Sequence, residues 1–133
     1  MASEAATITP AAASRALTED EIQDIIQAFG PATRRVIIAG FDGVELPGAH
    51  GFLLQNFLSP YFNQRPDEWG GPLINRRRFP LTVVQEVQRI IQPHATRPFL
   101  LGYRISPDEP QDGGLRIGDV YELLDRLAAL DID

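Results

Sequence analysis

A histidine directly follows a short apolar run in the first half of the chain. The run FDGVEL (41–46) ends in Pro47, Gly48, Ala49 and His50, and a segment dense in Asn, Arg, Asp, Trp and Gly continues to Arg76. An imidazole placed just beyond a strand can bind a ligand or move a proton near neutral pH. The alternative is a loop histidine that only hydrogen-bonds to backbone, and position alone does not separate the two.

An arginine lies near the carboxyl end of a second apolar run, LLGYRIS (100–106). A charge inside such a strand needs a partner, because burying it unpaired is costly. We favour Arg104 as an anion or cofactor contact at the carboxyl edge of the sheet. The alternative is a structural ion pair with an acidic side chain such as Glu45.

Other polar clusters predict structure more than chemistry. The run Arg76–Arg78 predicts a solvated helix face with local ion pairs. Asp108, Glu109 and Asp112 lack the spacing of a calcium loop and predict a solvated turn. His94 follows a proline at the expected end of a helix, where a histidine favours helix termination. No phosphate-loop or dinucleotide fingerprint is present, and two isolated histidines do not predict a metal site.

The composition narrows the function further. The chain has 133 residues, 44% of them apolar, and a formal net charge of −6, which fits one domain and argues against nucleic acid as a partner. All 12 basic residues are arginines and there is no cysteine, so lysine and thiol chemistry are excluded. No run approaches the roughly 20 apolar residues of a membrane span. We expect a cytoplasmic protein with no membrane partner.

The elements that position these residues begin with a helix. Residues 1–17, rich in Ala, Ser and Thr, predict an extended or disordered lead-in. Thr18 and Glu21 form a capping-box pattern that opens a helix toward Ile37. The Gly30-Pro31 pair within it predicts a kink or two abutting helices, because proline removes a backbone donor.

Strands and helices then alternate. Strands are expected at 41–46 and 97–106, the second with the continuous apolar character of a strand buried on both faces. A helix is expected over 73–91, bent by a proline near its start, and another strand at 131–133. A last helix carries the apolar stripe Val120, Leu123, Leu124, Leu127 and Leu130. This order predicts α/β structure with a parallel sheet, and too few strands for a whole one. A flavodoxin-like domain would need more strands and a phosphate loop.

The segment 39–76, AGFDGVELPGAHGFLLQNFLSPYFNQRPDEWGGPLINR, resembles the Old Yellow Enzyme family, whose pattern is AGFDGVEIHGA(H/N)xYL…FLSP…NxRxDxxGGSxxNR. GYRISPDE (102–109), followed by a Gly-Gly turn and a helix, also looks like that family. The resemblance covers 17–133. These NADH:flavin oxidoreductases and NADPH dehydrogenases are FMN-binding TIM barrels. The resemblance therefore implies a partial (β/α)8 barrel domain at 18–133, from about the third helix through the start of the sixth strand.

The resemblance also implies roles for single residues. Arg104 matches the arginine that stabilises negative charge on the reduced FMN, and His50 matches the second of two donors that polarise the substrate carbonyl. Pro47 stands where the first donor is expected, and Phe52 where the family has a proton-delivering tyrosine. Pro72 replaces a serine that would cap the next helix.

Two functions follow as expectations. One is an FMN-dependent NAD(P)H oxidoreductase of ene-reductase type, in which hydride passes from the reduced flavin to an activated alkene or a similar small-molecule substrate. The alternative is a non-catalytic truncated or split-barrel fragment that lacks a complete flavin site. Such a fragment would self-associate or pair with a complementary barrel chain through its exposed strand edges.

Overall fold

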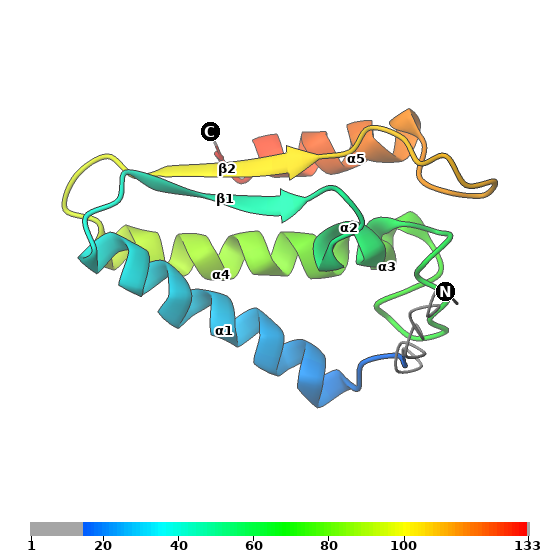
Figure 1. Cartoon of the computed structure of the whole chain (residues 1–133), viewed down its shortest axis with the longest axis horizontal. Helices are drawn as coiled ribbons and strands as arrows, with labels where there is room; N and C mark the ends of the chain where they lie inside the picture. Colours follow the sequence, from blue (N-terminus) through cyan, green and yellow to red (C-terminus); the bar gives the residue numbers. More distant parts are fainter. Residues whose placement is uncertain (1–14, 133) are drawn as a thin grey trace, which may run out of the picture.

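The computed structural model describes residues 15–132 and forms a mixed α/β structure in which helices cover one face of a small sheet (Figure 1). In chain order the elements are α1 (Glu19–Ile38), β1 (Gly43–Gly48), α2 (Leu53–Leu58), α3 (Leu73–Arg76), α4 (Arg78–His94), β2 (Leu100–Ile105) and α5 (Ile117–Ala128).

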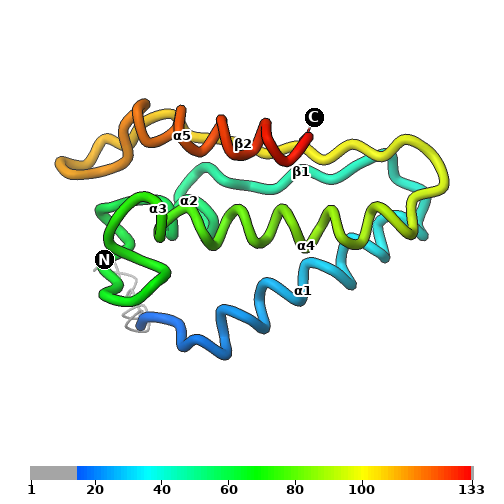
Figure 2. Tube along the Cα trace, turned by 180° about the vertical axis from the view of Figure 1, so that it is seen from behind, coloured from blue at the N-terminus to red at the C-terminus, as the bar shows by residue number. Residues whose placement is uncertain are grey.

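The two strands are parallel and run in register from Gly43 opposite Leu100 to Gly48 opposite Ile105. The α4 helix returns the chain between them, as the parallel arrangement requires. It packs against α1, and Figure 2 shows both helices from behind. The side chain of Gln88 on α4 hydrogen-bonds to the carbonyl of Leu130, just beyond α5. Three helices therefore share one face of the sheet.

The predicted capping box at the start of α1 is confirmed. The backbone N–H of Glu21 donates to the Thr18 hydroxyl at 3.2 Å, and the Thr18 N–H donates to the Glu21 carboxylate at 2.8 Å. Of the two alternatives predicted at Gly30-Pro31, a kink or two abutting helices, the second was wrong, because α1 is one helix that contains Pro31. A side chain at Gly30 would lie 2.4 Å from a Glu86 carboxylate oxygen. That glycine therefore permits close approach of α1 to α4.

The helix predicted over 73–91 is divided in two at Arg77, which ends α3 and precedes α4. Pro80 lies in the first turn of α4, where a missing N–H leaves no helical bond unmade. Pro72 gives α3 no side-chain cap, as expected. His94 ends α4 with its Nδ1 atom 2.9 Å from the carbonyl oxygen of Ile90.

The core lies between the sheet and the helices. Alternate strand residues such as Leu46 and Leu101 are buried there, with Val83 and Val87 of α4 and Leu123 of α5. The opposite sheet face is open, so the prediction that the second strand is buried on both faces was wrong. Helices cover only one face of the sheet in the part of the chain that the structure describes.

The α2 helix was not predicted. Residues 131 and 132 form no strand, and residue 133 lies outside the described residues, as do residues 1–14 of the predicted lead-in. Residues 15–17 lack regular secondary structure, and Leu17 packs against the core.

Candidate functional site

The carboxyl ends of β1 and β2 lie next to each other at one edge of the sheet. The sequence predicts its two candidate residues, His50 and Arg104, at these strand ends. Pro47 on β1 is the register partner of Arg104 on β2. Because side chains alternate along a strand, Glu45, Pro47 and Arg104 share the face that the helices leave open. His50 follows two residues after the end of β1.

Arg104 is paired but not buried. Its Nε atom donates to the Glu45 carboxylate at 2.8 Å, and both side chains are about half exposed. The hydrogen bond to Glu45, and then the charge of that carboxylate, raise the pKa of Arg104 above its ordinary value. The expectation of a buried arginine was therefore wrong, and the ion pair with Glu45 is present. A role for Arg104 toward a flavin stays a prediction.

His50 lies on the exposed turn between β1 and α2. It adopts a left-handed backbone conformation with φ of 59°, which is uncommon for a residue other than glycine. Its backbone N–H donates to the Ser106 hydroxyl, beyond β2, at 3.3 Å. Its ring makes no hydrogen bond to any residue that the structure describes, so the imidazole is free to contact a ligand.

The neighbours of His50 offer little chemistry of their own. Pro47 has no donor, and Phe52 has no hydroxyl; the Phe52 ring lies edge-on to the imidazole, with the ring centroids 6.4 Å apart. Phe52 is exposed and precedes the first turn of α2. Within this segment, His50 is thus the side chain equipped to donate a hydrogen bond to a substrate.

One acidic residue was misjudged from the sequence. Glu109, expected in a solvated turn, is only 3% exposed. Its carboxylate accepts hydrogen bonds from the Gln55 amide at 2.7 Å, from the Ser59 hydroxyl at 2.6 Å and from the Leu115 N–H at 2.8 Å. It therefore joins the loop after β2 to α2.

The polar segment between α2 and α3 is locked by its own side chains. The Asn63 amide donates to the carbonyls of Phe57 at 2.6 Å and Trp69 at 2.7 Å. Arg76, expected on a solvated face, is 7% exposed and donates to the carbonyls of Gly71 at 2.9 Å and of Leu58. The side chains of Asn63 and Arg76 therefore hold this segment in place through backbone carbonyls.

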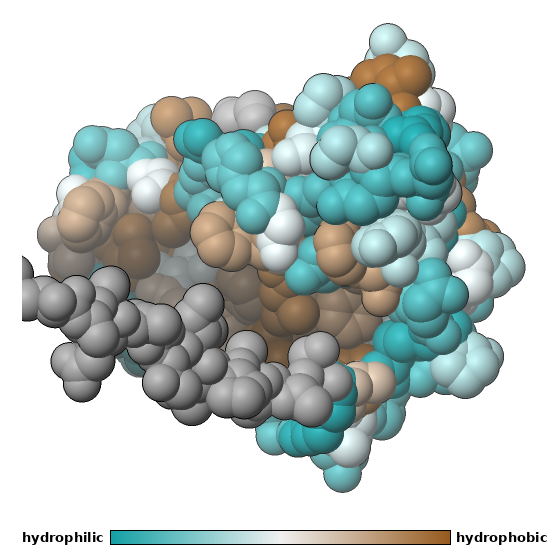
Figure 3. Space-filling model, turned by 45° about the vertical axis from the view of Figure 1, so that its right-hand side comes forward, coloured by the Kyte–Doolittle hydropathy of each residue, from teal (hydrophilic) through white to brown (hydrophobic). Residues whose placement is uncertain are grey.

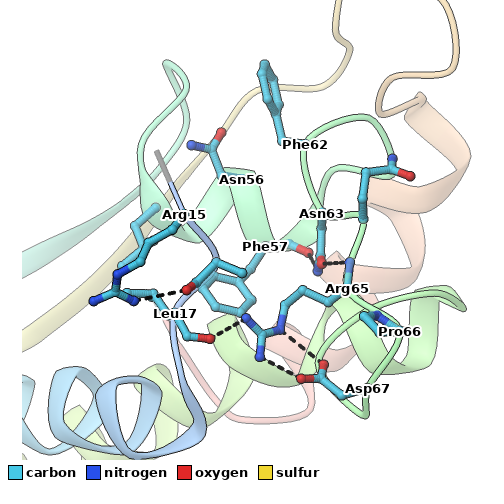
Figure 4. A pocket seen from close by; sticks show the side chains of 12 residues that line it. Arg15, Leu17, Asn56, Phe57, Phe62, Asn63, Arg65, Pro66 and Asp67 are labelled. Atoms are coloured by element: carbon cyan, nitrogen blue, oxygen red, sulfur yellow. Dashed lines mark hydrogen bonds and ion pairs between the residues drawn. The ribbon is translucent and has the colours of Figure 1, made fainter. Parts of the chain in front are cut away.

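A cavity of about 470 Å³ opens beside α2 and this loop (Figure 4). Apolar walls include Leu17 and Phe57, and the Arg65 guanidinium is held by the Leu17 carbonyl at 2.6 Å and by Asp67. Figure 3 shows apolar side chains gathered in a hollow with polar residues around it. The charged groups lining the cavity are thus already paired.

The described residues offer neither a cluster of metal ligands nor a membrane-spanning helix. Within 15–132, no group of three or more acidic, histidine or cysteine side chains could hold a metal ion. Helices long and apolar enough to cross a membrane are likewise absent from that part of the chain.

Comparison with known proteins gives one family. Residues 1–133 match the model of the NADH:flavin oxidoreductase / NADH oxidase family. A probable NADH-dependent flavin oxidoreductase, YqiG of Bacillus subtilis, is 52% identical over 120 residues, which are 90% of this chain and 32% of that protein. An NADH:fumarate oxidoreductase of Klebsiella pneumoniae is 47% identical over 92% of the chain and 13% of its own length.

Solved structures agree with the sequence matches. An old yellow enzyme homologue from Zymomonas mobilis superposes with a TM-score of 0.77 at 32% identity, over 90% of this chain and 33% of that one. Histamine dehydrogenase from Rhizobium gives a TM-score of 0.76 at 38% identity, over 84% of this chain and 16% of that one. These neighbours are TIM-barrel proteins of old yellow enzyme type. The chain spans about a third or less of the length of these relatives.

Proposed function

Because this chain belongs to the NADH:flavin oxidoreductase / NADH oxidase family, we propose that it supplies the segment of an FMN-dependent NAD(P)H oxidoreductase that faces both flavin and substrate. Membership of the family implies FMN as the cofactor and NAD(P)H as the reductant. The chain would form about the third helix through the start of the sixth strand of a (β/α)8 barrel. A TIM barrel carries its active site at the carboxyl ends of its strands, which is where Arg104 and His50 lie.

The observation that carries the proposal is the placement of Arg104 on the open face at that edge. Its Nε atom is committed to Glu45, and its other guanidinium nitrogens make no hydrogen bond to the residues that the structure describes. A fixed cation with free donors suits the oxygen- and nitrogen-rich edge of a flavin ring. Arg104 would hold that edge and favour negative charge on it.

His50 would bind the substrate. When bound, FMN supplies hydride transfer. His50 would donate a hydrogen bond to a carbonyl or carboxylate oxygen of the acceptor and draw electron density toward that oxygen. Relatives named for fumarate and acrylate, the second an NADH:acrylate oxidoreductase of Vibrio harveyi 43% identical over 117 residues, support an alkene conjugated to such a group.

The test is to add FMN to the purified chain, remove free flavin and follow NAD(P)H oxidation with an unsaturated carboxylate. Retained flavin absorbance and acceptor-dependent oxidation support the proposal. A chimera in which this chain replaces the 120 aligned residues of the Bacillus relative extends the test to a whole barrel. A colourless chimera contradicts the proposal.

The alternative is the non-catalytic fragment, favoured by Pro47 and Phe52 and by a sheet of two strands within the described residues. A colourless, self-associating chain together with an active chimera would favour it. Size-exclusion chromatography with light scattering reports that association. A compact monomer that retains flavin would contradict it.

A further inference from the structure

The turn that carries His50 is held from the side by a buried chain of hydrogen bonds. The chain starts at Glu109, whose carboxylate is fixed in the loop after β2 by the Leu115 N–H and the Ser59 hydroxyl. A side chain at Gly114 would lie 2.8 Å from the Glu109 Cβ atom. The loop therefore closes tightly around the carboxylate and fixes its position.

Gln55 of α2 forms the next link and is 5% exposed. Its amide nitrogen donates to Glu109 at 2.7 Å, and its amide oxygen accepts from the Gly51 N–H at 2.9 Å. The direction of both bonds is fixed, because a carboxylate only accepts and a backbone N–H only donates. Gln55 therefore transmits the position of Glu109 to the residue that follows His50.

The turn needs such support. His50 and Gly51 are consecutive residues with positive φ, 59° and 73°, and a non-glycine residue in this region persists only when its surroundings hold it. Two donors of the turn are anchored: the His50 N–H to Ser106 at 3.3 Å and the Gly51 N–H to Gln55. Ser106 and Glu109 both lie in the loop after β2, so that loop sets the turn after β1.

We propose that Gln55 and Glu109 are positioning residues that orient His50 toward the substrate, with no contact to substrate or cofactor themselves. The proposal rests on the function proposed for His50. It assigns the residues that set the geometry of the substrate donor, and it explains why a carboxylate lies buried in the loop after β2.

The fixed bond directions supply a sharp test. In Glu109→Gln, the new amide must turn its oxygen to Ser59 and Leu115, so its nitrogen faces the Gln55 nitrogen. If the Gln55 amide turns over to offer its oxygen to residue 109, its nitrogen then faces the Gly51 N–H, and two donors again meet. In Gln55→Glu, two buried carboxylates face each other and repel.

The double variant Gln55→Glu with Glu109→Gln restores every bond. The new carboxylate accepts from Gly51 and from the residue 109 amide, whose oxygen accepts from Ser59 and Leu115. Side-chain volume is almost unchanged in all three variants. If each single variant loses protection of the Gly51 amide and the double variant regains it, the hydrogen-bond chain itself is responsible. This conclusion also holds where a single variant folds poorly.

The primary readout is the Gly51 amide of the purified full chain, followed by NMR and hydrogen exchange. We expect each single variant to lose about tenfold in exchange protection at Gly51, the equivalent of one hydrogen bond, and the double variant to regain it. On the FMN-loaded chain with acrylate as the acceptor, we expect the single variants to raise KM by about tenfold with FMN affinity unchanged.

Equal exchange at Gly51 in all variants, or a double variant as impaired as the singles, would overturn the proposal. So would a KM that the single variants leave unchanged in an active chain. A chimera that binds no FMN refutes the proposed function instead; the Gly51 amide then still decides whether the hydrogen-bond chain holds the turn.

Discussion

Pro47 and Arg104 stand directly opposite each other as register partners at the carboxyl end of the parallel sheet. Their side chains share the face that the helices leave open, where Glu45 holds the Arg104 guanidinium. Pro47 places a rigid, apolar ring on the open face, beside the guanidinium of Arg104. The site therefore contains the Arg104 guanidinium and the His50 imidazole, but the side chain at position 47 cannot donate a hydrogen bond.

Replacing Pro47 by His should strengthen substrate binding. A second imidazole would lie on the open strand face, three residues before His50, and supply a second hydrogen bond to the acceptor oxygen. We expect KM for acrylate to fall by about tenfold, the worth of one hydrogen bond. Pro47→Ala is the matched control, because it restores the backbone N–H without a donor side chain. Equal KM values for the two variants would contradict this role.

Replacing Asn63 by Ala should destabilise the chain through the loop before α3. The change removes the amide that holds the carbonyls of Phe57 and Trp69 and leaves both without that donor. We expect the free energy of unfolding in urea to fall by about 3 kcal/mol. Gln64→Ala, on the exposed neighbour, should change it by less than about 0.5 kcal/mol. Similar losses in both variants would show that Asn63 does not lock the loop.

Tyr103 should make the chain less stable at high pH. Burial raises the pKa of its phenol above the ordinary 10.0, and its hydroxyl has no hydrogen-bond partner within the described residues. Above about pH 10 the unfolded chain loses this proton while the folded chain retains it, so the free energy of unfolding should fall as pH rises. Urea titrations from pH 8 to 12 measure the slope.

Tyr103→Phe should flatten that slope and leave stability at pH 8 unchanged or slightly higher, because it removes an unpaired buried hydroxyl. Tyr121→Phe, on the exposed face of α5, is the control and should keep the slope of the parent chain. A slope that survives in Tyr103→Phe would assign the pH dependence to other groups.

Much of the fold could be predicted because helix caps and apolar spacing in the sequence match the helix ends and buried faces in the structure. The capping box at Thr18 opens α1 as its sequence pattern requires. Of the stripe predicted in α5, Val120, Leu123 and Leu127 face the core, whereas Leu124 is exposed. The α2 helix escaped prediction because six residues are too few to establish a helical period. Arg77 separates α3 from α4 within a pattern that reads as one helix.

The polar residues were harder to interpret, because a sequence shows charge but not burial. Glu109 and Arg76 look like solvated residues but are buried and hydrogen-bonded. Arg104 looks buried because its neighbours are apolar, yet it lies on the open face. In each case the deciding contact comes from a segment at least five residues away, such as Ser59 for Glu109 or Glu45 for Arg104.

The affinity of the chain for FMN, measured by quenching of flavin fluorescence, tests the central claim most directly. We expect saturable binding that weakens by about tenfold in Arg104→Gln, since one charge-assisted contact is lost. Arg89→Gln removes a comparable exposed arginine paired with Glu86 on α4 and should leave the affinity unchanged. Equal affinity in the parent chain and Arg104→Gln would contradict the assignment of Arg104 to the flavin, and no quenching at all would favour the non-catalytic fragment.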